Sequence, residues 1–165
     1  MPFSTAGSIF SIDLDNMLRG LYRDNSDAAL TGTTNETTLK SVSVSANTIG
    51  GTGGFHVYAC GTLTGTAGTK TMRLKFGATT LATITQAAGT TGDWYFEAWC
   101  MNTATNAQRW FIQRNGNDLL TSTFDYTTST EDTTANKTLA VTGQLGAAGD
   151  TVTATVIDVF LVQIN

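Results

Sequence analysis

Beyond its first quarter, the chain is a series of short apolar runs separated by glycine-rich and asparagine-rich clusters. In one such run Met72, Leu74 and Phe76 share one side, while Lys70 and Lys75 indicate that the other side is polar. A period of two is typical of a β-strand with one buried face. The same reasoning predicts strands at 39–46, 55–63, 71–76, 80–86, 94–101, 109–114, 119–124, 138–142 and 151–164. About nine short strands joined by turns predict an all-β protein with a jelly-roll-like antiparallel β-sandwich over residues 39–165.

The first 38 residues break this pattern and predict a short N-terminal arm that could carry one helix. Leu14, Met17, Leu18 and Leu21 recur at helical spacing, and acidic residues precede basic ones in the order that the helix dipole favours. A single short helix is marginally stable in water and has to pack on something. We therefore predict two regions, an arm over residues 1–38 and a sandwich over 39–165, in which these four side chains pack the arm on another surface or contact a neighbouring subunit.

Some of the predicted strands are apolar on both sides. Tyr95, Trp99 and Met101 lie opposite the core side of their strand, and Trp110 belongs to a second run of this kind. An antiparallel sheet normally buries one face, and a second apolar face of this size is typical of an interface. We therefore predict a homo-oligomer in which Tyr95, Trp99 and Trp110 contact another subunit.

Composition supports the all-β prediction and argues against two classes of partner. About one residue in five is threonine, and four lysines and three glutamates are too few for the exposed faces of a helical bundle. The net charge is −4 and the nine basic residues are scattered, so no surface for nucleic acid is predicted. The most apolar stretch, residues 156–164, is too short to cross a bilayer and contains Asp158, so no membrane partner is predicted either.

Few residues in the sequence suggest chemistry. His56 is the single histidine and has no nucleophile motif beside it, and Glu97 has no second carboxylate tied to it by spacing. We therefore predict that the protein is not an enzyme and has no catalytic residues and no cofactor. One alternative remains open: Trp94, Trp99 and Trp110 could form a platform that stacks on sugar rings, which would make a glycan a partner.

Two acidic loops and two cysteines leave further alternatives. The segment from Asp24 to Asp27 has oxygen ligands at alternating positions, as calcium loops do, but lacks their central glycine and terminal glutamate. Glu131-Asp132 is a second acidic pair, and solvated turns without a metal are predicted at both places. Cys60 and Cys100 suit either two free thiols or one disulfide bridge.

Several segments together resemble a recurrent jelly-roll module of tailed-bacteriophage virion proteins, over about residues 39 to 165. They are Ala46-Asn47, Gly54–Gly61, Lys70–Gly77, Gly92–Ala98, Asn136–Leu145 and the strand that starts at Asp150. Relatives of this module look like capsid decoration proteins, head and tail fibres and spike heads, and they are often trimeric. The resemblance thus implies a homotrimer whose partner is the major capsid protein or another virion protein.

The resemblance also implies a location and a function. Because only a short arm precedes the predicted sandwich, a capsid decoration or cement protein of the head is favoured over a fibre. It would be assembled in the host cytoplasm and would occupy the outer surface of the virion capsid. The resemblance then implies that the arm anchors the protein on the capsid through Leu14, Met17, Leu18 and Leu21. The alternative is the receptor-binding or carbohydrate-binding head domain of a spike or fibre.

Overall fold

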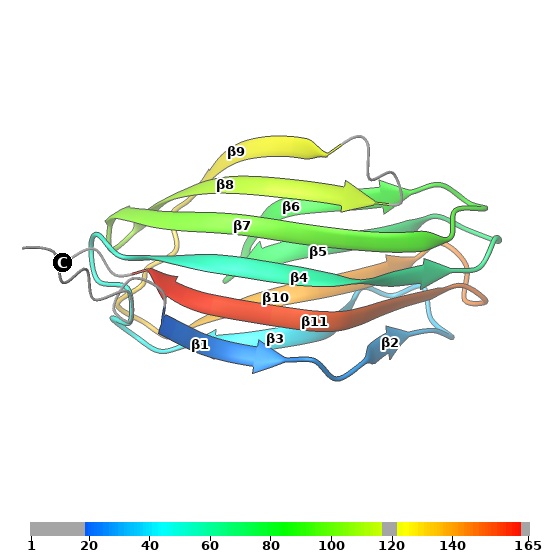
Figure 1. The fold of residues 1–165 in the computed structure, drawn as a ribbon, viewed down its shortest axis with the longest axis horizontal. Helices are drawn as coiled ribbons and strands as arrows, with labels where there is room; N and C mark the ends of the chain where they lie inside the picture. Colours follow the sequence, from blue (N-terminus) through cyan, green and yellow to red (C-terminus); the bar gives the residue numbers. More distant parts are fainter. Residues whose placement is uncertain (1–18, 117–121, 163–165) are drawn as a thin grey trace, which may run out of the picture.

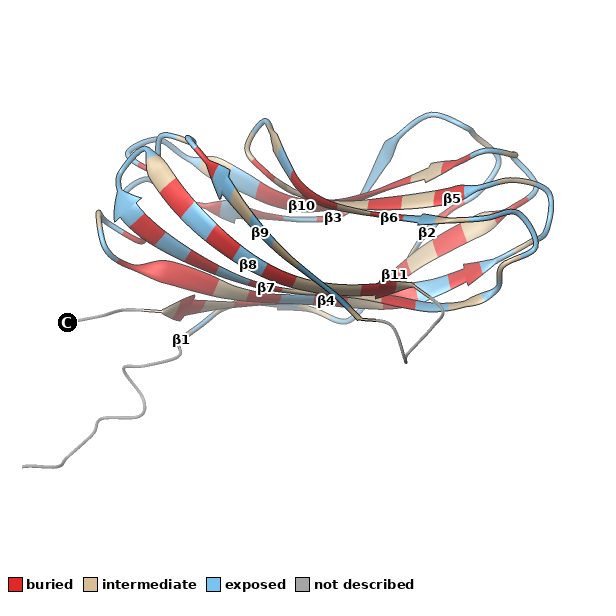
Figure 2. Cartoon of the chain, turned by 90° about the horizontal axis from the view of Figure 1, so that it is seen from above, coloured by how far each residue is buried: buried red, intermediate tan, exposed pale blue. Residues whose placement is uncertain are grey.

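The computed structural model describes residues 19–116 and 122–162, and within these ranges the chain forms eleven β-strands and no helix. The strands make two antiparallel sheets packed face to face (Figures 1 and 2). The larger sheet contains β1 (Arg19–Asp24), β2 (Ala28–Leu30), β4 (Gly54–Thr64), β7 (Gly92–Ala104), β8 (Ala107–Gly116), β9 (Thr123–Ser129) and β11 (Thr151–Val162). The smaller sheet contains β3 (Thr37–Val44), β5 (Lys70–Phe76), β6 (Thr79–Gln86) and β10 (Lys137–Leu145). This confirms the predicted all-β antiparallel sandwich.

The chain crosses repeatedly between the two sheets. The larger sheet has the order β1-β11-β4-β7-β8-β9, with β2 also paired to β11, and the smaller has the order β3-β10-β5-β6. Sequence neighbours such as β3 and β4, or β10 and β11, therefore lie in opposite sheets, as jelly-roll-like sandwiches require. The described residues contain no helix long and apolar enough to cross a membrane.

The core lies between the sheets and is rich in aromatic rings. Phe76 from the smaller sheet packs on Trp110, with ring centroids 5.5 Å apart, and on Phe55 at 5.9 Å. Trp110 is fully buried, and its indole Nε1 donates a hydrogen bond of 2.9 Å to Ser129 Oγ. The one polar atom of this buried indole is therefore satisfied inside the subunit.

The N-terminal region differs from the prediction. Leu21 belongs to strand β1, which pairs with β11, so the predicted helix is wrong at this residue. The pairing supplies backbone hydrogen bonds, and Leu21 packs against the core, so tertiary contacts override the helical spacing of the sequence. Strand β2 also joins β11, within a segment for which only a linker was predicted. Leu14, Met17 and Leu18 lie outside the described residues, so their predicted part in a helix stays a prediction.

The hydrophobic pattern predicted a strand over residues 119–124, of which 119–121 lie outside the described residues, and it missed the strand character of residues 125–129. Strand β9 runs over Thr123–Ser129 at the edge of the larger sheet. Its inward positions are Asp125 and Thr127, while the large side chains Phe124 and Tyr126 are exposed. An edge strand with polar inward positions has no apolar stripe that periodicity could detect.

Lys70 lies on the buried side of β5 with Met72, as a period of two requires, so its assignment to the polar side was wrong. Its Nζ donates to the carbonyl of Gly65 at 2.7 Å and lies 3.6 Å from Asp150 Oδ2. Asp150 in turn accepts backbone hydrogen bonds from Ala67 at 3.0 Å and Gly68 at 2.7 Å. These bonds, the one from Ala67 first, hold the pKa of Asp150 below its usual value although burial opposes them. The buried pair thus joins the β4–β5 loop to the β10–β11 loop.

Glu131 makes a similar connection at another turn. Its Oε1 accepts hydrogen bonds from Ala78 N at 2.8 Å and Thr79 Oγ1 at 2.9 Å, and Lys137 Nζ lies 3.0 Å from Oε2. Burial alone would raise the pKa of Glu131, but the bonds from Lys137, Thr79 and Ala78 outweigh it and the pKa is lowered. A lowered folded-state pKa means that this stabilisation is complete above the ordinary pKa of the carboxyl and is lost as the pH falls.

Glu131→Gln is therefore expected to reduce the free energy of unfolding at neutral pH by about 1–2 kcal/mol, since hydrogen bonds to a charged group are replaced by neutral ones. The stability of the variant should also fall less steeply between neutral pH and the acid limb than that of the parent. Urea unfolding at several pH values measures both effects. Asp27→Asn, which removes an exposed carboxylate, is the control, and equal pH profiles for parent and Glu131→Gln would contradict the account.

Candidate functional site

The two sheets differ in what they present to solvent. All exposed large hydrophobic side chains of the described residues lie on the larger sheet: Tyr22, Tyr58, Trp99, Met101, Phe111, Phe124 and Tyr126. The outward positions of the smaller sheet are small or charged, including Ser41, Ser43, Thr71, Arg73, Lys75, Thr83 and Thr85. Only the outer face of the larger sheet is therefore apolar.

Five of its side chains form one line across the sheet. Phe160 is opposite His56, His56 is opposite Trp99, Trp99 is opposite Phe111, and Phe111 is opposite Tyr126. Directly opposed residues on neighbouring strands project to the same side and contact each other. These five residues, from β11, β4, β7, β8 and β9 in that order, are called the aromatic row below.

Three of the four neighbouring pairs in the aromatic row are in ring contact, and three of its rings are exposed to solvent. The His56 ring stacks on Trp99 with centroids 4.0 Å apart and on Phe160 at 5.9 Å, and Phe111 meets Tyr126 at 5.3 Å. Trp99, Phe111 and Tyr126 remain 41%, 54% and 58% exposed. Four strand spacings make the row about 19 Å long. A partly exposed row of aromatic side chains of this length is typical of an interaction surface.

Two polar contacts lie beside the aromatic row. His56 Nε2 lies 2.9 Å from Glu97 Oε1. Arg23 donates two hydrogen bonds to the Asp158 carboxylate, at 2.7 and 2.9 Å, which raises the pKa of Arg23. A surface that buries the row would therefore meet the Arg23–Asp158 ion pair at one margin and the exposed Arg109 beside Phe111 near the other. Pairing lowers the cost of desolvating the first two charges, and Arg109 would need an acidic partner on the other surface.

The predicted subunit-contact residues do not lie together. Trp99 is the centre of the aromatic row, and Tyr95 projects from the same side of β7 four residues away. Trp110 is in the core, because its strand turns Phe111 outward in its place, so it presents nothing to a neighbour. Sequence reasoning missed the other four members of the row, whose alignment depends on strand order and register.

The tryptophan platform considered for sugars is also absent. Trp94 and Trp110 are buried on the inner side of the larger sheet, and Trp99 projects from its outer side. The three indoles therefore cannot contact one ligand. Of the predicted capsid anchors, Leu21 is half-buried against the core, while the other three lie outside the described residues.

The acidic loops are engaged in local bonding. Asp24 Oδ1 accepts a hydrogen bond from Ser26 N at 2.8 Å and lies 3.0 Å from Lys40 Nζ, and the bonds from Ser26 followed by that from Lys40 lower its pKa to about 2. Asp132 Oδ1 accepts from Thr134 N at 2.9 Å. No group of three or more His, Cys, Asp or Glu side chains able to hold a metal ion occurs in the part of the chain that the structure describes.

Cys60 and Cys100 are free thiols on opposite faces of the larger sheet, so the disulfide alternative is excluded. Cys60 is opposite Tyr95 on the outer side, and Cys100 is opposite Phe55 in the core. Burial raises the pKa of the Cys100 thiol. Since the thiolate is the reactive species, the two cysteines should differ strongly in reactivity.

Titration of the native protein with a thiol reagent is expected to modify Cys60 and to leave Cys100 unmodified until denaturant is added. Mass spectrometry of the modified peptides assigns the site. A Cys60→Ser variant serves as the control, since it should show no reaction in the native state. Equal native rates at both cysteines would be inconsistent with the burial of Cys100.

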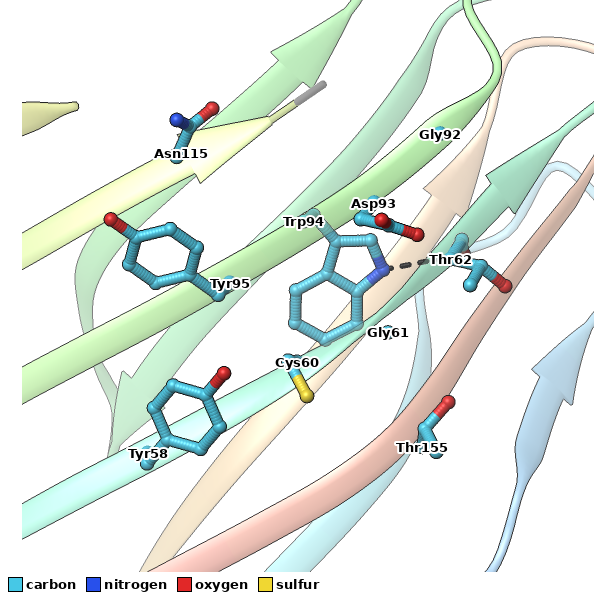
Figure 3. A pocket seen from close by; sticks show the side chains of 10 residues that line it. All are labelled: Tyr58, Cys60, Gly61, Thr62, Gly92, Asp93, Trp94, Tyr95, Asn115 and Thr155. Carbon is cyan, nitrogen blue, oxygen red and sulfur yellow. Dashed lines mark hydrogen bonds between the residues drawn. The ribbon is translucent and has the colours of Figure 1, made fainter. Parts of the chain in front are cut away.

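A cavity of about 470 Å³ opens on the same outer face, farther along the strands (Figure 3). Its walls come from β4, β7, β8 and β11. Its ten lining residues are Tyr58, Cys60, Gly61, Thr62, Gly92, Asp93, Trp94, Tyr95, Asn115 and Thr155. Burial, followed by a hydrogen bond with Cys60, raises the pKa of Tyr58 to about 12. The Tyr58 hydroxyl is therefore neutral at physiological pH.

Comparison with known proteins gives no family. No family model matches the sequence, and no curated protein matches it. Among solved structures, the chain is similar to the VP2 subviral particle of infectious bursal disease virus, with 16% identity, a TM-score of 0.30 and coverage of 90% of this chain and 42% of that chain. The structure of the Gx strain of this virus has 16% identity and a TM-score of 0.29, with coverage of 90% of this chain and 41% of that chain. The T13 particle of the virus has 15% identity and a TM-score of 0.25, with coverage of 90% of this chain and 40% of that chain.

The chain spans about two fifths of the length of these viral chains. At TM-scores of 0.25 to 0.30 these likenesses are loose.

Proposed function

We propose that this chain is a structural subunit of a virus particle, a capsid decoration protein that forms a homotrimer on the outer surface of the head. The observation that carries the proposal is the aromatic row, a solvent-exposed line of rings on one sheet only. The assignment to a virus particle and the trimeric state are both based on the sequence resemblance to the jelly-roll module of phage virion proteins. The major capsid protein or another virion protein would be the second partner.

The aromatic row favours association between copies of the chain. Burial of rings such as Trp99, Phe111 and Tyr126 removes a large apolar area from water, at about 25 cal/mol per Å². Aromatic residues of this kind supply most of the binding energy in subunit interfaces. A polar outer face on the smaller sheet would leave that side hydrated once the larger sheets are joined.

A decoration protein stabilises a capsid by mass action. A partner that binds only the assembled shell lowers the free energy of that shell and leaves free subunits unaffected. A trimer carries three copies of each shell-binding segment, so its avidity exceeds the affinity of one copy. We place that segment before β1, where Leu14, Met17 and Leu18 are the candidate anchors.

Electron microscopy of purified particles labelled with antibody to this chain tests the location. Regular labelling of the outer head surface supports the proposal, and label confined to the tail tip or a fibre supports the alternative of a spike or fibre head instead. The full chain with Leu14→Asp, Met17→Asp and Leu18→Asp is expected to remain a trimer and to stop co-sedimenting with particles. Co-sedimentation equal to that of the parent would contradict the proposal that these three residues anchor the chain on the capsid.

A further inference from the structure

An irregularity in strand pairing shapes the cavity on the outer face of the larger sheet. The side chains that matter for a ligand there are Tyr58, Tyr95, Asp93, Thr62 and Thr155. Strands β4 and β11 pair in register except for a shift between Ala154 and Val156, where Thr155 is the extra residue. Such a bulge turns a side chain that the regular sheet would have placed elsewhere. In Figure 3, Thr155 faces the cavity from β11, across from the two tyrosines on β4 and β7.

Two tyrosine rings form one wall. Tyr58 and Tyr95 are diagonal neighbours on β4 and β7, with ring centroids 6.4 Å apart and planes 25° apart. Gln113 Nε2 donates to the Tyr95 hydroxyl at 2.9 Å, and this hydroxyl also lies 3.0 Å from Ser122 Oγ. These bonds fix the Tyr95 ring, so the aromatic wall is formed before any ligand binds.

The rest of the cavity is polar and nearly uncharged. Among the described residues Asp93 is the only charged side chain in the lining, and no Lys, Arg or His contributes to it. Trp94 is buried as part of the floor, and its Nε1 donates to Thr62 O at 3.3 Å. The exposed Asp93 carboxylate and the hydroxyls of Thr62 and Thr155 are left to bond a ligand, since the described part of the chain offers them no side-chain hydrogen bond.

This chemistry excludes some classes of ligand and fits another. A phosphorylated, sulfated or carboxylated molecule would meet Asp93 with no cation to offset the repulsion. A purely apolar molecule would cover the carboxylate and two hydroxyls without replacing their hydrogen bonds with water. A pyranose ring has an apolar face of C–H groups for the tyrosines and hydroxyls for Asp93 and the threonines.

We propose that this cavity binds a neutral saccharide of one or two rings, which stacks on Tyr58 and Tyr95 and donates hydroxyl hydrogen bonds to Asp93. The volume of about 470 Å³ lies within the range of small-ligand sites. The inference does not rest on the proposed trimer. The cavity centres on Cys60 to Thr62, four to six residues along β4 from His56, which is about 13–20 Å at 3.3 Å per residue.

The test is saturation-transfer difference NMR on the full chain with a panel of neutral pyranoses and disaccharides at millimolar concentration. The panel is repeated with sialylated and sulfated sugars. At least one neutral sugar is expected to receive saturation, mainly at its C–H protons, and the anionic sugars are expected to bind more weakly. Absence of transfer to every neutral sugar, or stronger binding of the anionic ones, would overturn the proposal.

Two variants locate the binding. Tyr58→Ala should weaken the affinity for the best sugar at least tenfold, and Asp93→Asn, at an exposed position that folding does not require, should weaken it severalfold. Tyr126→Ala, which removes a tyrosine of the aromatic row, is the matched control and should bind as the parent does. Parent-like affinity in both Tyr58→Ala and Asp93→Asn would place the sugar elsewhere and overturn the proposal. Loss of binding only in Tyr126→Ala would do the same.

Discussion

Trp99→Lys is expected to convert the trimer into folded monomers at micromolar concentration. Trp99 is the central ring of the aromatic row, in contact with His56 at 4.0 Å, and it lies opposite Phe111. Truncation of such a residue in an interface costs about 2 kcal/mol or more, and a charge buried in its place adds a desolvation cost. Association should therefore weaken at least about 25-fold from the truncation alone, since each factor of ten corresponds to about 1.4 kcal/mol, and the buried charge should weaken it further. Light scattering after size exclusion measures the mass.

Thr85→Lys is the matched control for this variant. It introduces the same charge at an exposed position on the smaller sheet, where β6 presents Thr85 outward. The control should keep the mass of the parent, and both variants should keep the far-UV spectrum of a β-protein. A parent-like mass for Trp99→Lys would show that the aromatic row is not the contact between subunits.

Lys70→Ala is expected to destabilise the fold by about 3–5 kcal/mol, the usual cost of removing one partner of a buried ion pair. The ammonium is completely buried, donates to the carbonyls of Gly65 and Gly68, and lies 3.6 Å from Asp150. Its loss leaves buried acceptors without a donor. In a domain of this size the change should lower the melting temperature by about 10 °C. Urea unfolding at one fixed protein concentration measures the loss in free energy of unfolding, and thermal unfolding at the same concentration measures the change in melting temperature.

Lys75→Ala provides the comparison on the same strand. Lys75 lies on the outer side of β5 and pairs with Glu36 at 3.3 Å in a partly exposed position. Partly exposed ion pairs of this kind contribute about 0.2–1 kcal/mol. If Lys70→Ala proved no more destabilising than Lys75→Ala, the ion pair with Asp150 would not hold the two loops together.

Alternation of apolar and polar residues was enough to predict most of the strands. Met72, Leu74 and Phe76 on β5 were assigned to the core, and they are buried there. Tyr95 and Trp99 were separated from the core side of β7, and both project outward. Where one face of a strand is buried and the other is exposed to water, apolar and polar residues alternate along the sequence, and the alternation identifies the buried face.

The predictions failed where pairing with a neighbour decides the structure. Leu21 follows a helical spacing, but its segment pairs with β11 as an edge strand of the larger sheet. In β11 the spacing of Val152, Ala154 and Val156 would put all three on one side of a regular strand. The bulge between Ala154 and Val156 turns Ile157 into the core in place of Val156. Lys70 looks like a surface lysine until Asp150, eighty residues away, is placed beside it.

The candidate site was predictable only in part for the same reason. The excess of apolar residues on the outer side of one strand was visible from Trp99. The aromatic row itself needs the order of five strands and their register, which no single run of residues contains. Trp110 was assigned to the interface because its run is apolar on both sides, and only the structure shows that Phe111 is the outward residue.

The most direct test is the mass of the full chain by sedimentation equilibrium over a range of micromolar concentrations. The account predicts three times the 17.4 kDa of a single chain, with dissociation when the aromatic row is altered. A mass of one chain at every concentration, with Trp99, Phe111 and Tyr126 still exposed to solvent, would contradict the claim that this face joins copies of the protein.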